Sequence, residues 1–165
     1  MNKYSRLKST AYHEAGHAVA CYFLHFPFKY LTIEPEKDTL GHVKRFPHPK
    51  SFHPDYEGDT KTLNRIEKNI ITSYSGSAAE FILTGKYNSG GGTDSQYARE
   101  LADHYCGGPE ETEAFLKWMW ERTINWVQNP DFHWDAVEAL AQELLKKSRL
   151  TSKEAKQIIK ATSFK

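Results

Sequence analysis

Cysteine and long hydrophobic runs are both scarce in this sequence. The chain has 165 residues and two cysteines, Cys21 and Cys106, with no Cys-x-x-Cys pair, so a disulfide scaffold is not expected. The most apolar stretch, residues 18–33, is interrupted by a histidine, a proline and a lysine, and it falls short of the ~20 apolar residues that a membrane helix needs. The basic N-terminus has no apolar core after it and does not resemble a secretory signal. These absences predict a cytoplasmic chain with no membrane partner.

An excess of charge of one sign is also missing. The 22 lysines and arginines are balanced by 21 aspartates and glutamates, which leaves a formal net charge of +1. Proteins that bind nucleic acids usually carry a strongly basic surface, so a nucleic-acid partner is not expected. Hydrophobic residues make up 39% and charged residues 26%, which is typical of globular proteins. The length fits one domain over residues 1–165.

Apolar residues recur at helical spacing over most of the chain. The segments expected to be helical are residues 5–25, 60–83, 95–105, 110–128 and 134–148, with a last helix after Thr151. Pro27 should stop the first of them, and Gly85 suits the end of the second. Thr151-Ser152-Lys153-Glu154 is a capping-box sequence, which indicates the start of the last helix.

Two short runs of strand-forming residues lie between the first two helices. They cover residues 29–34 and 40–45, and the sequence Glu36-Lys37-Asp38 between them is typical of a turn. Residues 89–92 form a glycine-rich loop farther along the chain. The predicted fold class is α+β, mainly helical, with a small β-hairpin or sheet beside the first helix.

The most informative string is His13-Glu14-Ala15-Gly16-His17. Residues four apart lie above one another on a helix, so His13 and His17 can bind one metal ion while Glu14 projects toward a metal-bound water. Zinc suits imidazole nitrogen, and it lowers the pKa of its water from about 16 to around 7. Glu14 can then act as general base and pass the proton to a leaving amine. The alternative is a helix with two solvated surface histidines.

A third protein ligand is needed, and two residues are candidates. Glu80 lies in the second predicted helix, and a glutamate on a second helix commonly completes such a zinc site. Asp94 follows the glycine-rich loop at the start of a helix, where an aspartate could also be a simple N-cap. Helical spacing does not choose between them. Cys21 lies one turn beyond His17, but we expect it to be a small buried residue.

Four blocks of the sequence resemble the protease domain of FtsH-type ATP-dependent zinc metalloproteases. In order along the chain they are residues 10–18 (TAYHEAGHA), residues 31–35 with 40–43, residues 75–80 with 89–94, and residues 140–150 with the helix after them. The first block, which contains both histidines, is the most specific. Together the blocks cover nearly the whole chain.

The resemblance implies a zinc endopeptidase with a zincin-like, mainly helical fold. It makes His13, His17 and Asp94 the zinc ligands and Glu14 the catalytic residue. Glu80 would then not bind the metal itself but would hydrogen-bond one of the ligand histidines. A single domain would comprise a zinc-helix and hairpin half, about residues 1–105, and a C-terminal helical half, about residues 109–165.

The same resemblance implies a polypeptide substrate. An extended peptide would add by backbone hydrogen bonds to the edge strand formed by Leu40, Gly41, His42 and Val43. The ATPase module and the membrane anchor of that family are not expected here, because only twelve residues precede His13. A separate ATPase or regulatory partner is possible, and the sequence predicts no oligomeric state.

Two departures from the family pattern leave alternatives open. Ser77 stands where the family usually has arginine, and Thr93 where it usually has asparagine. One alternative is therefore a catalytically silent metal-binding module that regulates another protease. Another is a dedicated protease for one cytoplasmic regulatory protein, and ligation by Glu80 instead of Asp94 would favour it.

Overall fold

A computed structural model of the chain describes residues 3–36, 40–47, 52–54, 58–86, 92–129 and 133–162. The elements in chain order are α1 (Lys3–Phe23), β1 (Phe28–Thr32), β2 (His42–Arg45), α2 (Thr60–Thr84), α3 (Thr93–Asp103), α4 (Pro109–Gln128), α5 (Asp135–Lys147), β3 (Arg149–Thr151) and α6 (Ser152–Thr162). The chain is thus mostly helical with one small antiparallel sheet, which confirms the α+β class. The predicted turn at residues 36–38 and the glycine-rich loop lie largely outside the described residues.

The ends of the first two helices follow from their local sequence. α1 ends at Phe23, two residues earlier than predicted, because His25 adopts a left-handed conformation with φ of 63°. α2 begins after Asp59, whose carboxylate accepts a hydrogen bond from the backbone N–H of Thr62 at 2.7 Å. α2 ends as predicted at Gly85, which has φ of 67°.

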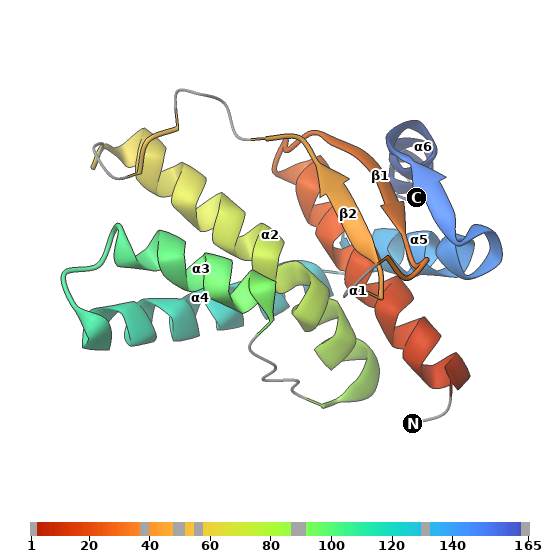
Figure 1. Ribbon diagram of the computed structural model, residues 1–165, viewed down its shortest axis with the longest axis horizontal. Helices are drawn as coiled ribbons and strands as arrows, with labels where there is room; N and C mark the ends of the chain where they lie inside the picture. Colours follow the sequence, from red (N-terminus) through yellow and green to blue (C-terminus); the bar gives the residue numbers. More distant parts are fainter. Residues whose placement is uncertain are drawn as a thin grey trace.

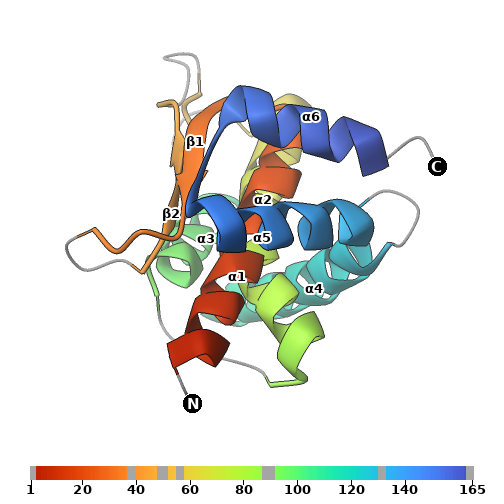
Figure 2. The ribbon, with the colours of Figure 1, turned by 90° about the vertical axis from the view of Figure 1, so that its right-hand side faces the viewer.

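The two longest helices, α1 and α2, run side by side through the centre of the molecule (Figure 1). In that view α3 and α4 lie on the α2 side, and α5 and α6 lie on the α1 side. Figure 2 shows the sheet along one flank of α1 with the helices stacked beside it. None of the described helices is long and apolar enough to cross a membrane.

Buried apolar residues form two clusters that match this arrangement. One joins α1 and β1 to α5 and α6, and it contains Val19, Leu31, Leu140 and Ile159, all fully buried. The other joins α2 to α3 and α4 through residues such as Ile70 and Met119. The helix pair α1–α2 therefore stands between two cores, and Ala78 and Ala79 of α2 also belong to the first of them.

The sheet has the order β2-β1-β3, so β2 is an edge strand. Leu31 of β1 pairs with Val43 on one side and with Leu150 on the other. The strand β3 was not predicted, and the small sheet is therefore more than a hairpin. The predicted strand start at Leu40 was also wrong, because β2 begins at His42.

The last helix starts as its sequence indicates. The backbone N–H of Thr151 donates to the Glu154 carboxylate at 2.9 Å, and the backbone N–H of Glu154 lies 3.3 Å from the Thr151 hydroxyl. These reciprocal bonds form a capping box. The prediction at this position is confirmed.

Glycine allows α1 and α2 to approach very closely where they meet. A Cβ atom on Gly16 would overlap the Ser75 carbonyl oxygen and come within 3.0 Å of the Ala79 Cβ. On α2, a Cβ on Gly76 would lie 2.5 Å from Nε2 of His17 and 2.7 Å from Nε2 of His13. Backbone therefore packs on backbone at this contact, and larger residues would separate the helices.

A methyl group at this contact should cost stability. We expect Gly16→Ala to lower the free energy of unfolding by roughly 1–3 kcal/mol, the usual cost of overpacking a well-packed core. The matched control is Gly58→Ala, since a Cβ at Gly58 meets nothing within 4 Å, and it should change stability by about 0.5 kcal/mol or less. Urea denaturation of the three proteins measures the difference. Equal midpoints for Gly16→Ala and wild type would contradict the close packing.

Candidate metal centre

The two histidines of the pentapeptide come together on α1. Their Nε2 atoms lie 3.0 Å apart, and their ring centroids are separated by 4.7 Å in an edge-to-face arrangement. The side chain of His13 is 22% exposed and that of His17 is 12% exposed. The four-residue spacing on a helix thus produces the predicted pair, and both rings remain reachable from the cavity described below.

A backbone carbonyl on α2 orients His17. Its Nδ1 lies 2.7 Å from the carbonyl oxygen of Thr72. A carbonyl oxygen can only accept a hydrogen bond, so Nδ1 of His17 carries a proton. In the neutral ring the lone pair is then on Nε2, which faces His13.

A carboxylate has the same relation to His13. Oε2 of Glu80 lies 3.4 Å from Nδ1 of His13, and Oε1 of Glu80 accepts a hydrogen bond from the Ser9 hydroxyl at 2.6 Å. Glu80 therefore contacts the side of the His13 ring away from His17. A residue that shares one ion with both Nε2 atoms would lie on the opposite side of the His13 ring.

Asp94 occupies the shared side of the two rings. Its Oδ2 lies 3.3 Å from Nε2 of His17 and 3.6 Å from Nε2 of His13. The N-cap of α3 is Gly92, and Asp94 lies in the first turn of that helix. The simple N-cap interpretation of Asp94 is therefore wrong. The helix N-terminus does favour its negative charge.

The three ligand-type atoms fit a tetrahedral metal ion. Zinc bonds of about 2.0–2.2 Å to imidazole nitrogen and carboxylate oxygen place neighbouring ligand atoms of a tetrahedron roughly 3.3–3.6 Å apart. The separations of 3.0, 3.3 and 3.6 Å among His13, His17 and Asp94 lie around this range. Gly76 leaves free the space beside both Nε2 atoms that a side chain would fill. The donor set, two imidazoles and one carboxylate, suits zinc.

The electrostatics of the cluster favour a positive charge at this point. Burial alone would lower the pKa of His13, but the hydrogen bonds and charges of Asp94, Glu80 and Glu14 outweigh it and raise the pKa to about 10. Burial alone would raise the pKa of Asp94, yet the two histidines hold it well below its usual range. Without a metal, the cluster therefore favours the protonated form of His13.

Glu14 is the most deeply buried carboxylate of the cleft, with 5% of its surface exposed. Burial raises its pKa above the usual value, and the nearby His17 and His13 reduce that rise. The backbone of Gly41 covers its stem, since a Cβ on Gly41 would lie 3.0 Å from Cγ of Glu14. A raised carboxylate pKa brings the group closer to neutral pH, as proton transfer requires.

A cavity of about 460 Å³ opens onto these groups, and we call it the histidine cleft. It is lined by His13, Glu14, His17, Glu80 and Asp94 together with residues 40–43, Arg45 and parts of α2. The predicted edge residues therefore do face the cleft. Leu40 and Gly41 do so from the segment before β2, and His42 and Val43 from the strand itself.

Three supporting groups were not singled out from the sequence. They are the Ser9 hydroxyl, the Thr72 carbonyl and the space at Gly76. No short motif identifies them, because each depends on how α2 lies against α1. Cys21 is fully buried, and burial raises its pKa to about 11, which fits the expected small buried residue.

Comparison with known proteins places this geometry in a family. Residues 1–106 match the family described as Peptidase family M41. This segment is well over half of the chain and contains every member of the cluster. The chain belongs to this family.

Several curated relatives share the matched region, and each is described as an ATP-dependent zinc metalloprotease FtsH. The protein from Haemophilus influenzae is 34% identical over 101 residues, and that from Magnetococcus marinus is 34% identical over 97 residues. In both cases the aligned part covers 58% of this chain. It covers 14% and 13% of the respective relatives, so the chain spans about one seventh of their length.

The residues that match Peptidase family M41 include the first three blocks identified in the sequence. The fourth block, residues 140–150, lies beyond the matched residues. The strand β3 and helices α4–α6 likewise follow the match. The resemblance to FtsH-type enzymes is confirmed for the part of the chain that carries the cleft.

The protonation of His13 beside its three carboxylate neighbours can be measured directly. In protein stripped of metal, we expect the His13 ring to titrate near pH 10, because Asp94, Glu80 and Glu14 stabilise its charged form. Asp94→Asn should lower this midpoint by about one to three pH units. The control Glu113→Gln removes a carboxylate whose exposed partner is Arg99 and should leave it unchanged. Long-range ¹H–¹⁵N spectra of the imidazoles report the titration, and an ordinary midpoint in wild type would contradict the coupling.

Proposed function

We propose that this protein is a zinc-dependent endopeptidase that hydrolyses unfolded or flexible polypeptides. The observation that carries the proposal is the convergence of two imidazole nitrogens and one carboxylate beside a buried glutamate in an open cleft. Membership of Peptidase family M41 and the description of the relatives as zinc metalloproteases support the same chemistry. The zincin-like description of the fold is part of this proposal.

We assign His13, His17 and Asp94 as the zinc ligands. The Nδ1 contacts to Thr72 and Glu80 leave both Nε2 atoms facing the Asp94 carboxylate. Glu80 orients His13 from the opposite side of its ring, as carboxylates commonly do for metal-binding histidines. Of the two candidate third ligands, the geometry therefore favours Asp94.

Zinc, when bound, supplies a Lewis acid that makes water a good nucleophile near neutral pH. Glu14 acts as the general base: its buried carboxylate accepts the proton of the attacking water and then donates it to the leaving amine. The Gly41 backbone packs against the Glu14 stem, which restricts the carboxylate to the floor of the histidine cleft. The walls of the cleft keep the peptide close to this carboxylate.

The substrate would bind in extended form along β2. The edge of β2 that is not paired with β1 is available for backbone hydrogen bonds, and the adjoining residues line the cleft. Binding through backbone hydrogen bonds depends little on the side chains of the substrate and requires an unfolded segment. Folded proteins would need an unfoldase, and the description of the relatives as ATP-dependent is consistent with such help.

Replacing the proposed base separates metal binding from catalysis. Glu14→Gln preserves size and should keep one zinc per chain, while cleavage of dephosphorylated β-casein falls roughly 10²–10⁴-fold. The matched control is Glu110→Gln on the exposed start of α4, which should retain full activity. Gel-based and mass-spectrometric assays of casein peptides, with elemental analysis for zinc, make the comparison. Equal absence of cleavage by wild type and Glu14→Gln across many substrates would favour a silent regulatory module.

The two candidate third ligands predict opposite affinity orders. Glu80→Gln should weaken zinc binding by about 10–100-fold, and Asp94→Ala should weaken it further because a direct ligand is lost. Zinc affinity should rise with pH across the neutral range, because His13 must release a proton. Competition with a chromophoric chelator measures the zinc affinity of each variant relative to wild type and the dependence of that affinity on pH. A larger loss for Glu80→Gln than for Asp94→Ala would overturn the assignment of Asp94.

A further inference from the structure

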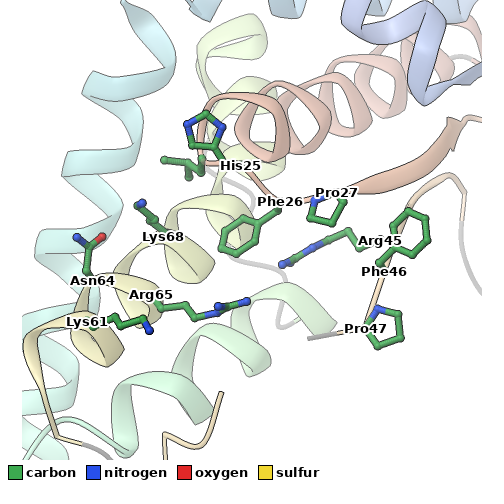
Figure 3. A pocket seen from close by; sticks show the side chains of 11 residues that line it. His25, Phe26, Pro27, Arg45, Phe46, Pro47, Lys61, Asn64, Arg65 and Lys68 are labelled. Carbon is green, nitrogen blue, oxygen red and sulfur yellow. The ribbon is translucent and has the colours of Figure 1, made fainter. Parts of the chain in front are cut away.

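A second cavity lies beside the histidine cleft and is lined almost entirely by basic and apolar groups. It has a volume of about 400 Å³, and we call it the basic cavity. Its eleven lining residues include Arg45, Lys61, Arg65 and Lys68 and contain no aspartate or glutamate. Figure 3 shows Arg45 and Arg65 extending toward each other from β2 and α2, with the Phe26 ring close to both.

The positive charge of this cavity is not neutralised within the part of the chain that the structure describes. Arg45 donates to the neutral side-chain oxygen of Asn69 at 2.9 Å and lies over the Phe26 ring. Nε of Arg65 is buried and has no hydrogen-bond partner among the described residues. Buried donors normally have partners, and like charges gathered around one hollow repel each other. An anionic group in the cavity would accept a hydrogen bond from a buried donor and would reduce the repulsion between the basic side chains.

The basic cavity and the histidine cleft share part of a wall. Arg45 at the end of β2 lines both hollows. On α2, Lys61, Arg65, Lys68 and Thr72 follow one another at intervals of four, three and four residues, so they share one face of the helix. Thr72 is the residue that lines the cleft and orients His17. Arg45 and this face of α2 therefore mark out one path along the surface from the candidate metal centre to the basic cavity.

We propose that the basic cavity is a specificity subsite that binds an acidic side chain of the polypeptide substrate. The inference rests on the peptidase function proposed above and adds a sequence preference to it. Arg65 and Arg45 provide donors in the fork geometry that carboxylates match, and Phe26 and Phe46 provide apolar walls for the carbon stem. A peptide lying along the β2 edge would pass Arg45 and reach the cavity without leaving the path.

Helix geometry sets the distance between the acidic residue and the cleaved bond. At about 1.5 Å per helical residue, Lys68, Arg65 and Lys61 lie roughly 6, 10 and 16 Å along α2 from Thr72. An extended peptide advances about 3.3 Å per residue, so the acidic residue lies about two to five positions from the scissile bond. β2 runs from the cleft toward the cavity, and both strand pairs of the sheet are antiparallel. Antiparallel addition therefore places the acidic residue on the N-terminal side of the bond.

The test compares glutamate with glutamine in otherwise identical peptides. Mass spectrometry of dephosphorylated β-casein digests by the full zinc-loaded chain first supplies one cleavage site. Peptides around that site, acetylated and amidated at their ends, then carry Glu or Gln at each of the five positions before the bond. We expect kcat/KM to favour Glu by roughly three- to tenfold at one or two of these positions, as for a partly exposed charge-assisted contact. Added salt should reduce the preference.

Variants of the cavity identify the residues responsible. The double variant Arg65→Glu and Lys68→Glu should abolish the preference for Glu or replace it by one for Lys. If this variant unfolds early in thermal circular dichroism, the double variant Lys61→Glu and Lys68→Glu takes its place. It leaves Arg65 and its buried Nε unchanged. The matched control Lys156→Glu makes the same kind of charge change on exposed α6 and should retain the wild-type preference.

The possible outcomes separate this inference from the proposed function. Cleavage with equal kcat/KM for Glu and Gln peptides overturns the subsite and leaves the peptidase intact. A gain from a free C-terminal carboxylate in place of the amide, without a gain from Glu, also overturns it. If wild type cleaves nothing, fluorescence anisotropy with zinc-loaded Glu14→Gln decides, with peptides of one fixed β-casein segment that carry Glu or Gln at each position in turn. Tighter binding of the Glu peptide, lost on charge reversal, then supports the subsite, while equal binding rejects it.

Discussion

The close approach of α1 and α2 is the contact on which the remaining arrangement depends. Gly16 lets the backbone of α2 approach α1 at Ser75, and Gly76 leaves room for both imidazoles. The same contact brings the Thr72 carbonyl to His17 and the Glu80 carboxylate to His13. Small residues therefore act indirectly here: they bring polar groups of one helix within bonding distance of the other. Two separate apolar cores hold the helices from opposite sides.

The orientation of the two histidine rings follows from what bonds their Nδ1 atoms. A carbonyl from α2 and a carboxylate from α2 each face one ring, so that both Nε2 atoms turn toward Asp94 at the start of α3. Three helices thus contribute residues to one site. Among the described residues, none of these contributions comes from a loop. Rigid elements hold such groups more accurately than loops do, which suits the binding of one ion in fixed geometry that we propose.

Local signals in the sequence were sufficient for most elements and for the pair of histidines, because helical period, Gly85 and the Thr151 capping box act within a few residues. They were insufficient where tertiary contacts decide. The strand β3 is only three residues long, and its extended form depends on pairing with β1. Helical spacing did not distinguish Glu80 from Asp94, and only the family resemblance favoured Asp94, since the choice depends on which ring nitrogen each carboxylate faces. The basic cavity joins three distant segments without a motif.

The third strand has a consequence for how the molecule can be divided. Likeness to the family ends at residue 106, yet β1 takes one of its two neighbours from β3, and α1 rests on apolar residues of α5 such as Val137 and Leu140. A fragment truncated at that limit would keep every residue of the cleft but would expose the underside of α1 and a newly bare edge of β1. The family-matched part of the chain thus contains the candidate site, while the later strand and helices cover its apolar surfaces.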